Sequence, residues 1–176
     1  MALLQPYLDD GKLVVPSGQT KLDRITTLRW DGPTAQRRMS GILAKSYGGR
    51  KVDAVLSPYD GISRGVLSAL KSVGYGSGGR PLPVITGQDA ELDSVKSIIA
   101  GQQSQTVYKD VRHLAQAAAT MVDDILNERE PEVDTSVDYD NGVKPVPAVL
   151  LQPLSVDKTN YDLLVQSEYF TADQLK

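Results

Sequence analysis

Six polar and aromatic side chains fall where predicted strands give way to helices, at positions suited to binding a ligand. They are Arg29, Trp30, Tyr59, Asp60, Asp89 and Lys109. Ligands of open α/β sheets bind just beyond the carboxyl ends of the strands, so a binding site is expected at these junctions. The site would hold aromatic rings among hydrogen-bonding groups of both charges.

This mixture of side chains suits a monosaccharide. A pyranose has an apolar C–H face that packs on an indole or phenol ring. Its rim carries hydroxyls that both donate and accept hydrogen bonds. Carboxylates accept from these hydroxyls, and Lys or Arg donates to them, in charge-assisted bonds that are stronger than neutral ones.

Each of these side chains also has an ordinary structural interpretation. Asp60 and Asp89 precede predicted helices, where Asp is a favoured N-cap residue. Trp30, the only tryptophan, is compatible with a place in the core, and Arg29 and Lys109 with surface positions. An enzymatic alternative also stays open, because two carboxylates about 5–10 Å apart can hydrolyse a glycoside.

The elements that must position these residues alternate between strand and helix. Short apolar runs predict five strands, at residues 12–15, 52–57, 82–86, 105–108 and 148–151. Apolar residues at helical spacing predict helices over about 34–47, 62–73, 94–99 and 111–128, and the tail at 160–176 is expected to hold one or two helical turns. Strands that alternate with helices indicate βαβ units, so the predicted class is α/β, doubly wound, with a mostly parallel sheet.

The composition excludes several classes of protein. The chain has 176 residues, no cysteine and one histidine, so disulfides, thiol nucleophiles and multi-histidine metal centres are not expected. Its net charge of -3 comes without a basic stripe, which argues against nucleic-acid binding. No apolar run is long enough for a membrane span. Residues 1–6 lack a signal-peptide pattern, so we expect no export signal in this chain.

The chain resembles the periplasmic monosaccharide-binding proteins of ABC transporters, which have the type I periplasmic binding protein fold, in their xylose and multiple-sugar branch. The matching segments are residues 27–31, 52–61, 87–91, 97–101, 106–109 and 141–147. They occur in order over essentially the whole chain. The chain resembles only the C-terminal half of the family pattern, without the first lobe.

The resemblance assigns roles to the candidate residues. It implies that Trp30 stacks on the sugar, that Asp60 and Asp89 accept hydroxyl hydrogen bonds, and that Lys109 donates one. Tyr59 stands where some relatives have asparagine, and Arg29 is a further candidate contact. The resemblance implies a non-catalytic protein without a cofactor, and a periplasmic location.

The resemblance also predicts a division of the chain and its partners. Residues 1–110 would form the sugar-binding lobe, residues 111–140 a helix and loop that pack on the first lobe, and residues 141–176 the return through the hinge. The expected partners are a monosaccharide and an ABC transporter permease. Without the first lobe, helix 111–128 would expose an apolar face and favour self-association. A sugar-responsive regulatory domain and a sugar-modifying enzyme that uses Asp60 or Asp89 remain the alternative functions.

Overall fold

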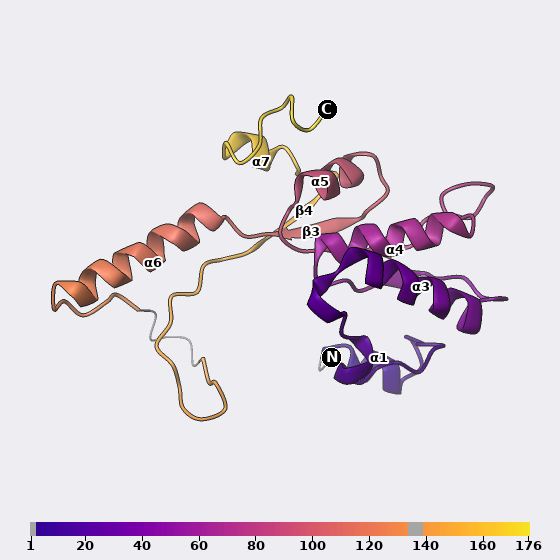
Figure 1. The fold of residues 1–176 in the computed structure, drawn as a ribbon, viewed down its shortest axis with the longest axis horizontal. Helices are drawn as coiled ribbons and strands as arrows, with labels where there is room; N and C mark the ends of the chain where they lie inside the picture. Colours follow the sequence, from indigo (N-terminus) through magenta and orange to yellow (C-terminus); the bar gives the residue numbers. More distant parts are fainter. Residues whose placement is uncertain (1–2, 134–138) are drawn as a thin grey trace.

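The structure, a computed structural model, describes residues 3–133 and 139–176. From α3 onward its helices and strands alternate, so the predicted α/β class is confirmed (Figure 1). The elements in chain order are α1 (Gln5–Asp9), α2 (Leu22–Ile25), the 3-10 helix η1 (Leu28–Trp30), α3 (Gly32–Ser46), β1 (Ala54–Val55), α4 (Asp60–Ser72), β2 (Val84–Ile85), α5 (Leu92–Ile99), β3 (Gln105–Tyr108), α6 (Val111–Leu126), β4 (Leu154–Asp157) and α7 (Leu163–Gln166).

Two short two-stranded sheets, β1–β2 and β3–β4, lie at the centre of the described structure and are linked by a bridge. β1 and β2 are parallel, with Ala54 opposite Val84. A parallel bridge between Gln88 and Val107 links the chain after β2 to β3. β4 pairs with β3 in the antiparallel direction. The carboxyl ends of β1, β2 and β3 therefore lie near one another, as the binding-site prediction requires.

Helices α3 and α4 pack directly on each other and form the larger part of the core. Their backbones approach closely at Gly65, where an added Cβ would lie 2.2 Å from the carbonyl oxygen of Gly32. Only glycine permits this approach. The first core cluster lies between these helices and the sheet, and it contains Ala35, Met39, Leu43, Val52, Ile62, Val66, Leu67, Ala69, Leu70, Tyr75 and Ile85.

A second apolar cluster joins α5, β3, β4 and the C-terminal residues. Val156 of β4 and Leu164 of α7 are fully buried in it. Tyr169 packs edge-to-face against Tyr108 on one side and Phe170 on the other. The tail beyond β4 therefore belongs to the fold and contains the predicted helical turn.

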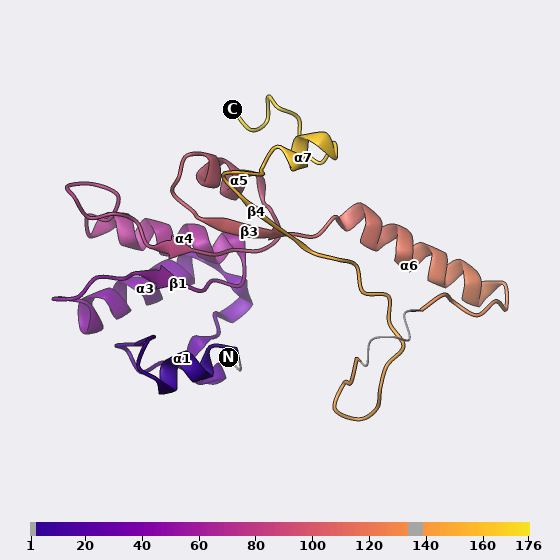
Figure 2. The ribbon, with the colours of Figure 1, turned by 180° about the vertical axis from the view of Figure 1, so that it is seen from behind.

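Helix α6 stands out from the rest of the molecule (Figures 1 and 2). Asp110 caps its start by accepting a hydrogen bond from the backbone N–H of Arg112 at 3.0 Å. The guanidinium of Arg112 donates to the carbonyl oxygens of Ser167 and Glu168, which ties this end to the C-terminal segment. No residue of α6 is buried. The division of the chain at residues 110 and 140 stays a prediction.

Two of the five predicted strands are wrong. Residues 12–15 form no strand in the described structure, since no neighbouring strand pairs with them, and Val14 and Val15 are exposed. Residues 148–151 lie in the extended return segment with Leu150 and Leu151 exposed, and β3 pairs instead with residues 154–157, which bury Val156. β1 and β2 are also shorter than predicted, with two residues each.

Candidate functional site

The candidate residues come from the segments that follow β1, β2 and β3, together with η1. Tyr59 and Asp60 lie at the start of α4, Asp89 lies between β2 and α5, and Lys109 follows β3 directly. Trp30 ends η1, just before α3. Tyr59, Asp60, Asp89 and Lys109 are thus brought to one edge of the sheet, and Trp30 reaches that edge through Tyr59.

Trp30 and Tyr59 form an aromatic pair. Their ring centroids are 6.2 Å apart and their planes meet at 85°, an edge-to-face arrangement. The Tyr59 ring lies so close over Gly61 that a Cβ there would be 2.5 Å from its Cε1 atom. Trp30 keeps 57% of its surface exposed. An apolar ligand face can therefore reach the indole ring.

Tyr59 is held by an acidic residue that the sequence analysis did not single out. Its hydroxyl donates to Oε1 of Glu91 at 2.5 Å, and the other carboxylate oxygen of Glu91 accepts from Arg64. The hydrogen bond to Glu91 is the main cause that raises the pKa of Tyr59 above its ordinary value. Glu91 does lie within a segment of the resemblance. Arg64 lies four residues after Asp60 on α4, a spacing that could have drawn attention to it.

Asp89 and Lys109 form an ion pair across the edge of the sheet. The Lys109 Nζ atom lies 2.9 Å from Oδ1 of Asp89, and the two side chains keep 38% and 44% of their surface exposed. The pair is therefore open to a ligand that brings hydroxyl groups. Such a ligand can donate to the carboxylate and accept from the ammonium group.

Asp60 is not exposed, as an acceptor of ligand hydroxyl groups would have to be. Its side chain is fully buried. Its carboxylate accepts from the backbone N–H of Glu91 at 2.9 Å, from Nε2 of Gln103 at 3.0 Å and from the hydroxyl of Thr106 at 3.0 Å. Gly87 leaves room for it, because a Cβ there would lie 2.0 Å from Oδ1 of Asp60.

The buried position of Asp60 argues against the expected role as a hydroxyl acceptor. Burial raises the pKa of its carboxyl group, and the hydrogen bonds from Gln103, Glu91 and Thr106 oppose that rise. A carboxylate that is buried and accepts three protein hydrogen bonds has no face for a substrate. It ties the segments after β1 and β2 to β3. The same burial argues against the alternative in which Asp60 and Asp89 act as a hydrolytic pair.

Backbone strain marks two of the candidate loops. Arg29 and Trp30 have positive φ angles of 58° and 57°, and Asp89 and Ala90 have 95° and 50°. Residues other than glycine rarely adopt this region, and such strain clusters at ligand sites. Nothing in the local sequence signals it, since neither loop offers glycine at these positions.

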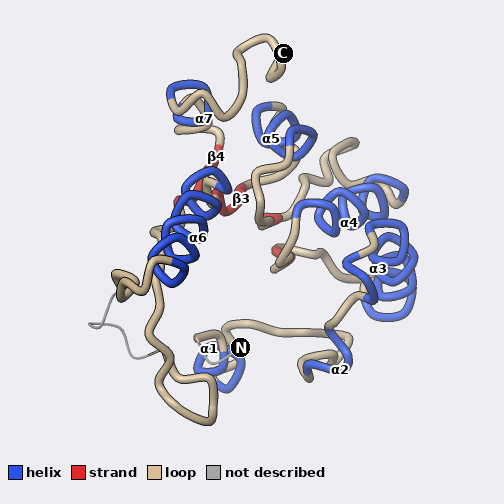
Figure 3. The backbone as a smooth tube through the Cα atoms, turned by 60° about the vertical axis from the view of Figure 1, so that its left-hand side comes forward, coloured by secondary structure: helices blue, strands red, loops and turns tan. Residues whose placement is uncertain are grey.

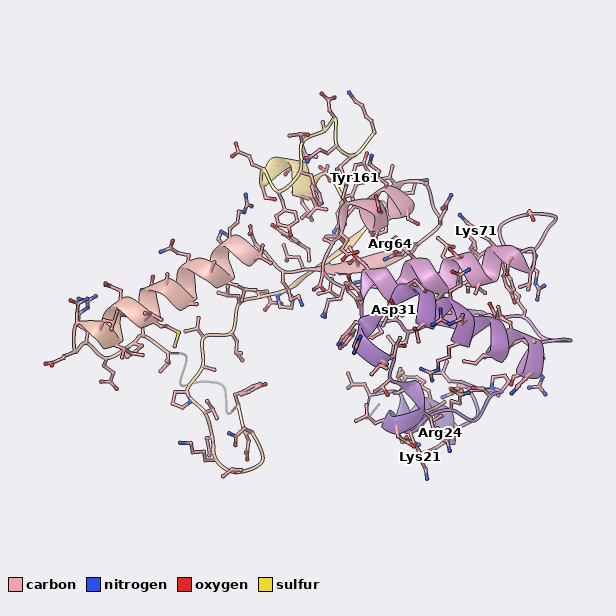
Figure 4. All side chains as sticks on the ribbon, in the orientation of Figure 1. Lys21, Arg24, Asp31, Arg64, Lys71 and Tyr161 are labelled. Carbon is pink, nitrogen blue, oxygen red and sulfur yellow. The ribbon has the colours of Figure 1, made fainter. Side chains whose placement is uncertain are left out.

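Arg29 lies beside the aromatic pair. It lines a cavity of about 490 Å³ with Trp30, Asp31, Tyr59 and Arg64, at the common end of α3 and α4. Figure 4 shows Asp31 and Arg64 at that end, which faces β3. Within residues 3–133 and 139–176 Arg29 has no ion-pair partner. The cavity adjoins the aromatic pair from the side of the helices.

The described part of the chain offers no metal centre and no membrane span. No group of three or more His, Asp or Glu residues in it could hold a metal ion. The lone His113 is exposed at the start of α6. No described helix is both long enough and apolar enough to cross a bilayer.

Comparison with known proteins adds independent information. Residues 4–130 match the family model described as a periplasmic binding protein domain. The chain is 56% identical over its full length to a multiple sugar-binding periplasmic receptor, ChvE, of Rhizobium radiobacter, and covers 50% of that protein. It is 34% identical over 99% of its length to the D-xylose-binding periplasmic protein of Escherichia coli K12, of which it covers 49%.

Solved structures agree with these relatives. An ABC transporter solute-binding protein from Clostridium phytofermentans with bound β-D-glucose superposes with a TM-score of 0.90 at 42% identity, over 100% of this chain and 54% of that one. A carbohydrate transporter solute-binding protein from Chloroflexus aurantiacus in complex with D-glucose gives 0.83 at 30% identity, over 98% and 54%. The chain spans about half the length of the curated relatives it matches.

Proposed function

This chain belongs to the periplasmic binding protein family, and on that premise we propose that it is one lobe of a monosaccharide receptor of an ABC sugar importer. The ligand would be a sugar of the xylose, galactose, glucose or arabinose type. The curated relatives are named as sugar-binding proteins of the periplasm, not as enzymes. The proposed role is therefore non-catalytic, in the periplasm.

The observation that carries the proposal is the open Asp89–Lys109 ion pair, at the sheet edge that also holds the aromatic pair. A pyranose placed there would stack its C–H face on the exposed ring of Trp30. One of its hydroxyls would donate to Asp89 while another accepts from Lys109. Because both partners are charged, these bonds are stronger than those between neutral groups.

The remaining candidates take supporting roles in this proposal. Tyr59 fixes the ring of Trp30 and is itself fixed by Glu91. Asp60 holds the strand ends in register, because its three hydrogen bonds join their segments. Arg29 lines the same cavity as Trp30 and is a further candidate contact.

The proposal includes a second lobe and a transporter. One sheet edge covers one side of a sugar, whereas binding pockets for small ligands bury most of the ligand surface. We infer that the other half of the receptor closes over the sugar, and that sugar favours the closed state by binding it more tightly. The closed receptor would then deliver the sugar to an ABC transporter permease.

The test uses a chimera in which this chain replaces the matching half of the Rhizobium radiobacter relative. Isothermal titration calorimetry with xylose, galactose, glucose and arabinose should give saturable heat for at least one sugar. Asp89→Asn should weaken that binding by about 1–3 kcal/mol, roughly 5- to 150-fold, because a charged acceptor is lost.

Asp93→Asn is the matched control, because it removes an exposed carboxylate from the same region without touching the ion pair. Its affinity should equal that of the unmodified chimera. A folded chimera that gives no heat with any of the four sugars would refute the proposed function. Equal losses in the two variants would refute the role of Asp89.

A further inference from the structure

The connection between α6 and β4 contains a short hairpin at residues 139–146 (Figure 3). The hairpin is closed by the backbone N–H group of Val146, which donates to the carbonyl oxygen of Tyr139 at 2.8 Å. Its tip carries the dipeptide Asn141–Gly142, and Gly142 has a φ angle of 84°. The residues of the tip are exposed, so water reaches them from the outside.

The backbone nitrogen of Gly142 is paired with a carboxylate. Its N–H group donates to Oδ1 of Asp140 at 2.7 Å. A general base must lie within hydrogen-bond distance of the proton that it removes, and Asp140 meets this condition. Glycine has no Cβ atom, so no side chain on Gly142 shields its nitrogen from an electrophile.

The side-chain amide of Asn141 is the neighbouring electrophile. Its Oδ1 atom accepts from the backbone N–H groups of Val143 at 2.9 Å and of Lys144 at 3.0 Å. The bond to Val143, two residues further on, folds the side chain over the peptide unit of Gly142. The two donors also stabilise the negative charge that Oδ1 gains when a nucleophile adds to Cγ.

A nucleophile, a base and two oxyanion donors therefore surround one side-chain amide. We propose that Asn141 is a site of self-catalysed deamidation, with water as the co-reactant. The nitrogen of Gly142 gives its proton to Asp140 and forms a bond to Cγ of Asn141. The Cγ–Nδ2 bond then breaks, and the amide group leaves as ammonia with the proton that Asp140 returns. A cyclic imide remains between the two residues.

Water completes the modification by opening this imide. Opening at Cγ restores the original main chain and leaves aspartate at position 141. Opening at the main-chain carbonyl leaves isoaspartate, in which the main chain passes through the former side chain. Both products add a negative charge beside Asp140, and like charges repel, so the modified hairpin should be less stable than the original one.

The two other asparagines of the chain lack this arrangement and serve as controls within the same molecule. Neither is followed by glycine. Nδ2 of Asn127 donates to the carbonyl oxygen of Asp123 at 2.8 Å, and Nδ2 of Asn160 donates to that of Ser155 at 2.9 Å. In both residues the nitrogen that would have to leave is therefore held by a hydrogen bond.

Incubation of the purified chain at pH 7 and 37 °C, followed by digestion and mass spectrometry of the peptides, tests the proposal. The peptide with Asn141 should deamidate at least about tenfold faster than the peptides with Asn127 and Asn160, because only Asn141 has the reacting groups in place. Part of the product should be isoaspartate, which forms only through the imide. The readout needs no sugar, so it is independent of the proposed sugar binding.

A pair of variants tests the role of Asp140. Asp140→Ala removes the base and should slow the deamidation of Asn141 at least about fivefold. Glu132→Gln removes an exposed carboxylate from the preceding segment and should leave the rate unchanged. Equal rates at the three asparagines would overturn the proposal, as would a product that contains aspartate alone, because water would then attack the amide directly. An unchanged or faster reaction in Asp140→Ala would overturn the assignment of Asp140 as the base.

Discussion

At the residue scale, the candidate site depends on contacts between side chains that never touch the proposed ligand. Glu91 accepts from the hydroxyl of Tyr59 while it pairs with Arg64, and the rings of Tyr59 and Trp30 pack edge-to-face. The positive φ angle of Trp30 adds strain that these contacts must offset. These contacts thus fix the orientation of the Trp30 indole, although more than half of the residue is exposed.

Removal of the Tyr59 hydroxyl should loosen this arrangement. Tyr59→Phe leaves the Glu91 oxygen without its donor, and the free energy of unfolding should fall by about 1 kcal/mol. Denaturation followed by the fluorescence of Trp30, the only tryptophan, measures this change. Tyr161→Phe is the control, since no hydrogen bond of its hydroxyl occurs in the described structure and it lies on the second cluster (Figure 4). Equal stability of Tyr59→Phe and the unmodified chain would contradict the positioning role.

At the scale of elements, the start of α3 decides where Trp30 lies. Asp31 is the N-cap residue, and its carboxylate accepts from the backbone N–H of Thr34 at 2.7 Å. Pro33 in the first turn suits a helix start, where its missing N–H has no role. Because Trp30 directly precedes this cap, an ordered helix start also orders the aromatic pair.

The N-cap hydrogen bond of Asp31 should make the stability of the protein depend on pH. Hydrogen bonds from Thr34 lower the pKa of Asp31 below its ordinary value of 3.8. The cap therefore stabilises the protein fully above pH 3.8, and the stabilisation is lost as the pH falls through the lowered folded-state pKa. Asp31→Ala should melt below the unmodified chain at pH 6, and the difference should shrink under more acidic conditions. A difference in melting temperature that is constant between pH 6 and pH 3 would exclude the carboxylate cap.

At the scale of the whole molecule, two apolar surfaces remain open. One is a groove beside β1 that Leu22, Ile42 and Val66 line among other apolar residues, and the other is the face of α6. The exposed apolar residues of α6 include Val111, Leu114, Val122, Ile125 and Leu126. Isolated helices of this length are marginal in water, so α6 gains from packing against a partner. Both surfaces are consistent with a chain that covers half of its relatives.

The face of α6 should make the isolated chain self-associate. Sedimentation of the free chain should give an average mass that rises with concentration, because apolar faces of two copies can cover each other. Val122→Lys should reduce the association, since it places a charge within that face. Gln116→Lys adds the same charge to the opposite side of the helix and should leave the association unchanged. A chain that stays monomeric at every concentration would show that α6 does not serve as such a contact.

Local patterns in the sequence determined much of the architecture. The predictions for α3, α4, α5, β3 and α6 are confirmed because each has a strong apolar period or a clear start and stop signal. The junction rule for α/β sheets also led to Asp89 and Lys109, which the structure joins in an ion pair. Both inferences depend on short stretches of chain and on a general property of parallel sheets.

Only the tertiary structure decided the rest, because it depends on which segments become neighbours. Residues 12–15 and 148–151 have strand-like composition but form no strand in the described structure, whereas residues 154–157 pair with β3 and bury Val156. Asp60 has the residue type of a ligand contact, but three donors from distant positions enclose it. Glu91 reaches both Tyr59 and Arg64 across more than two dozen residues of sequence. Strand pairing and enclosure are properties of the assembled fold, which no single stretch of sequence contains.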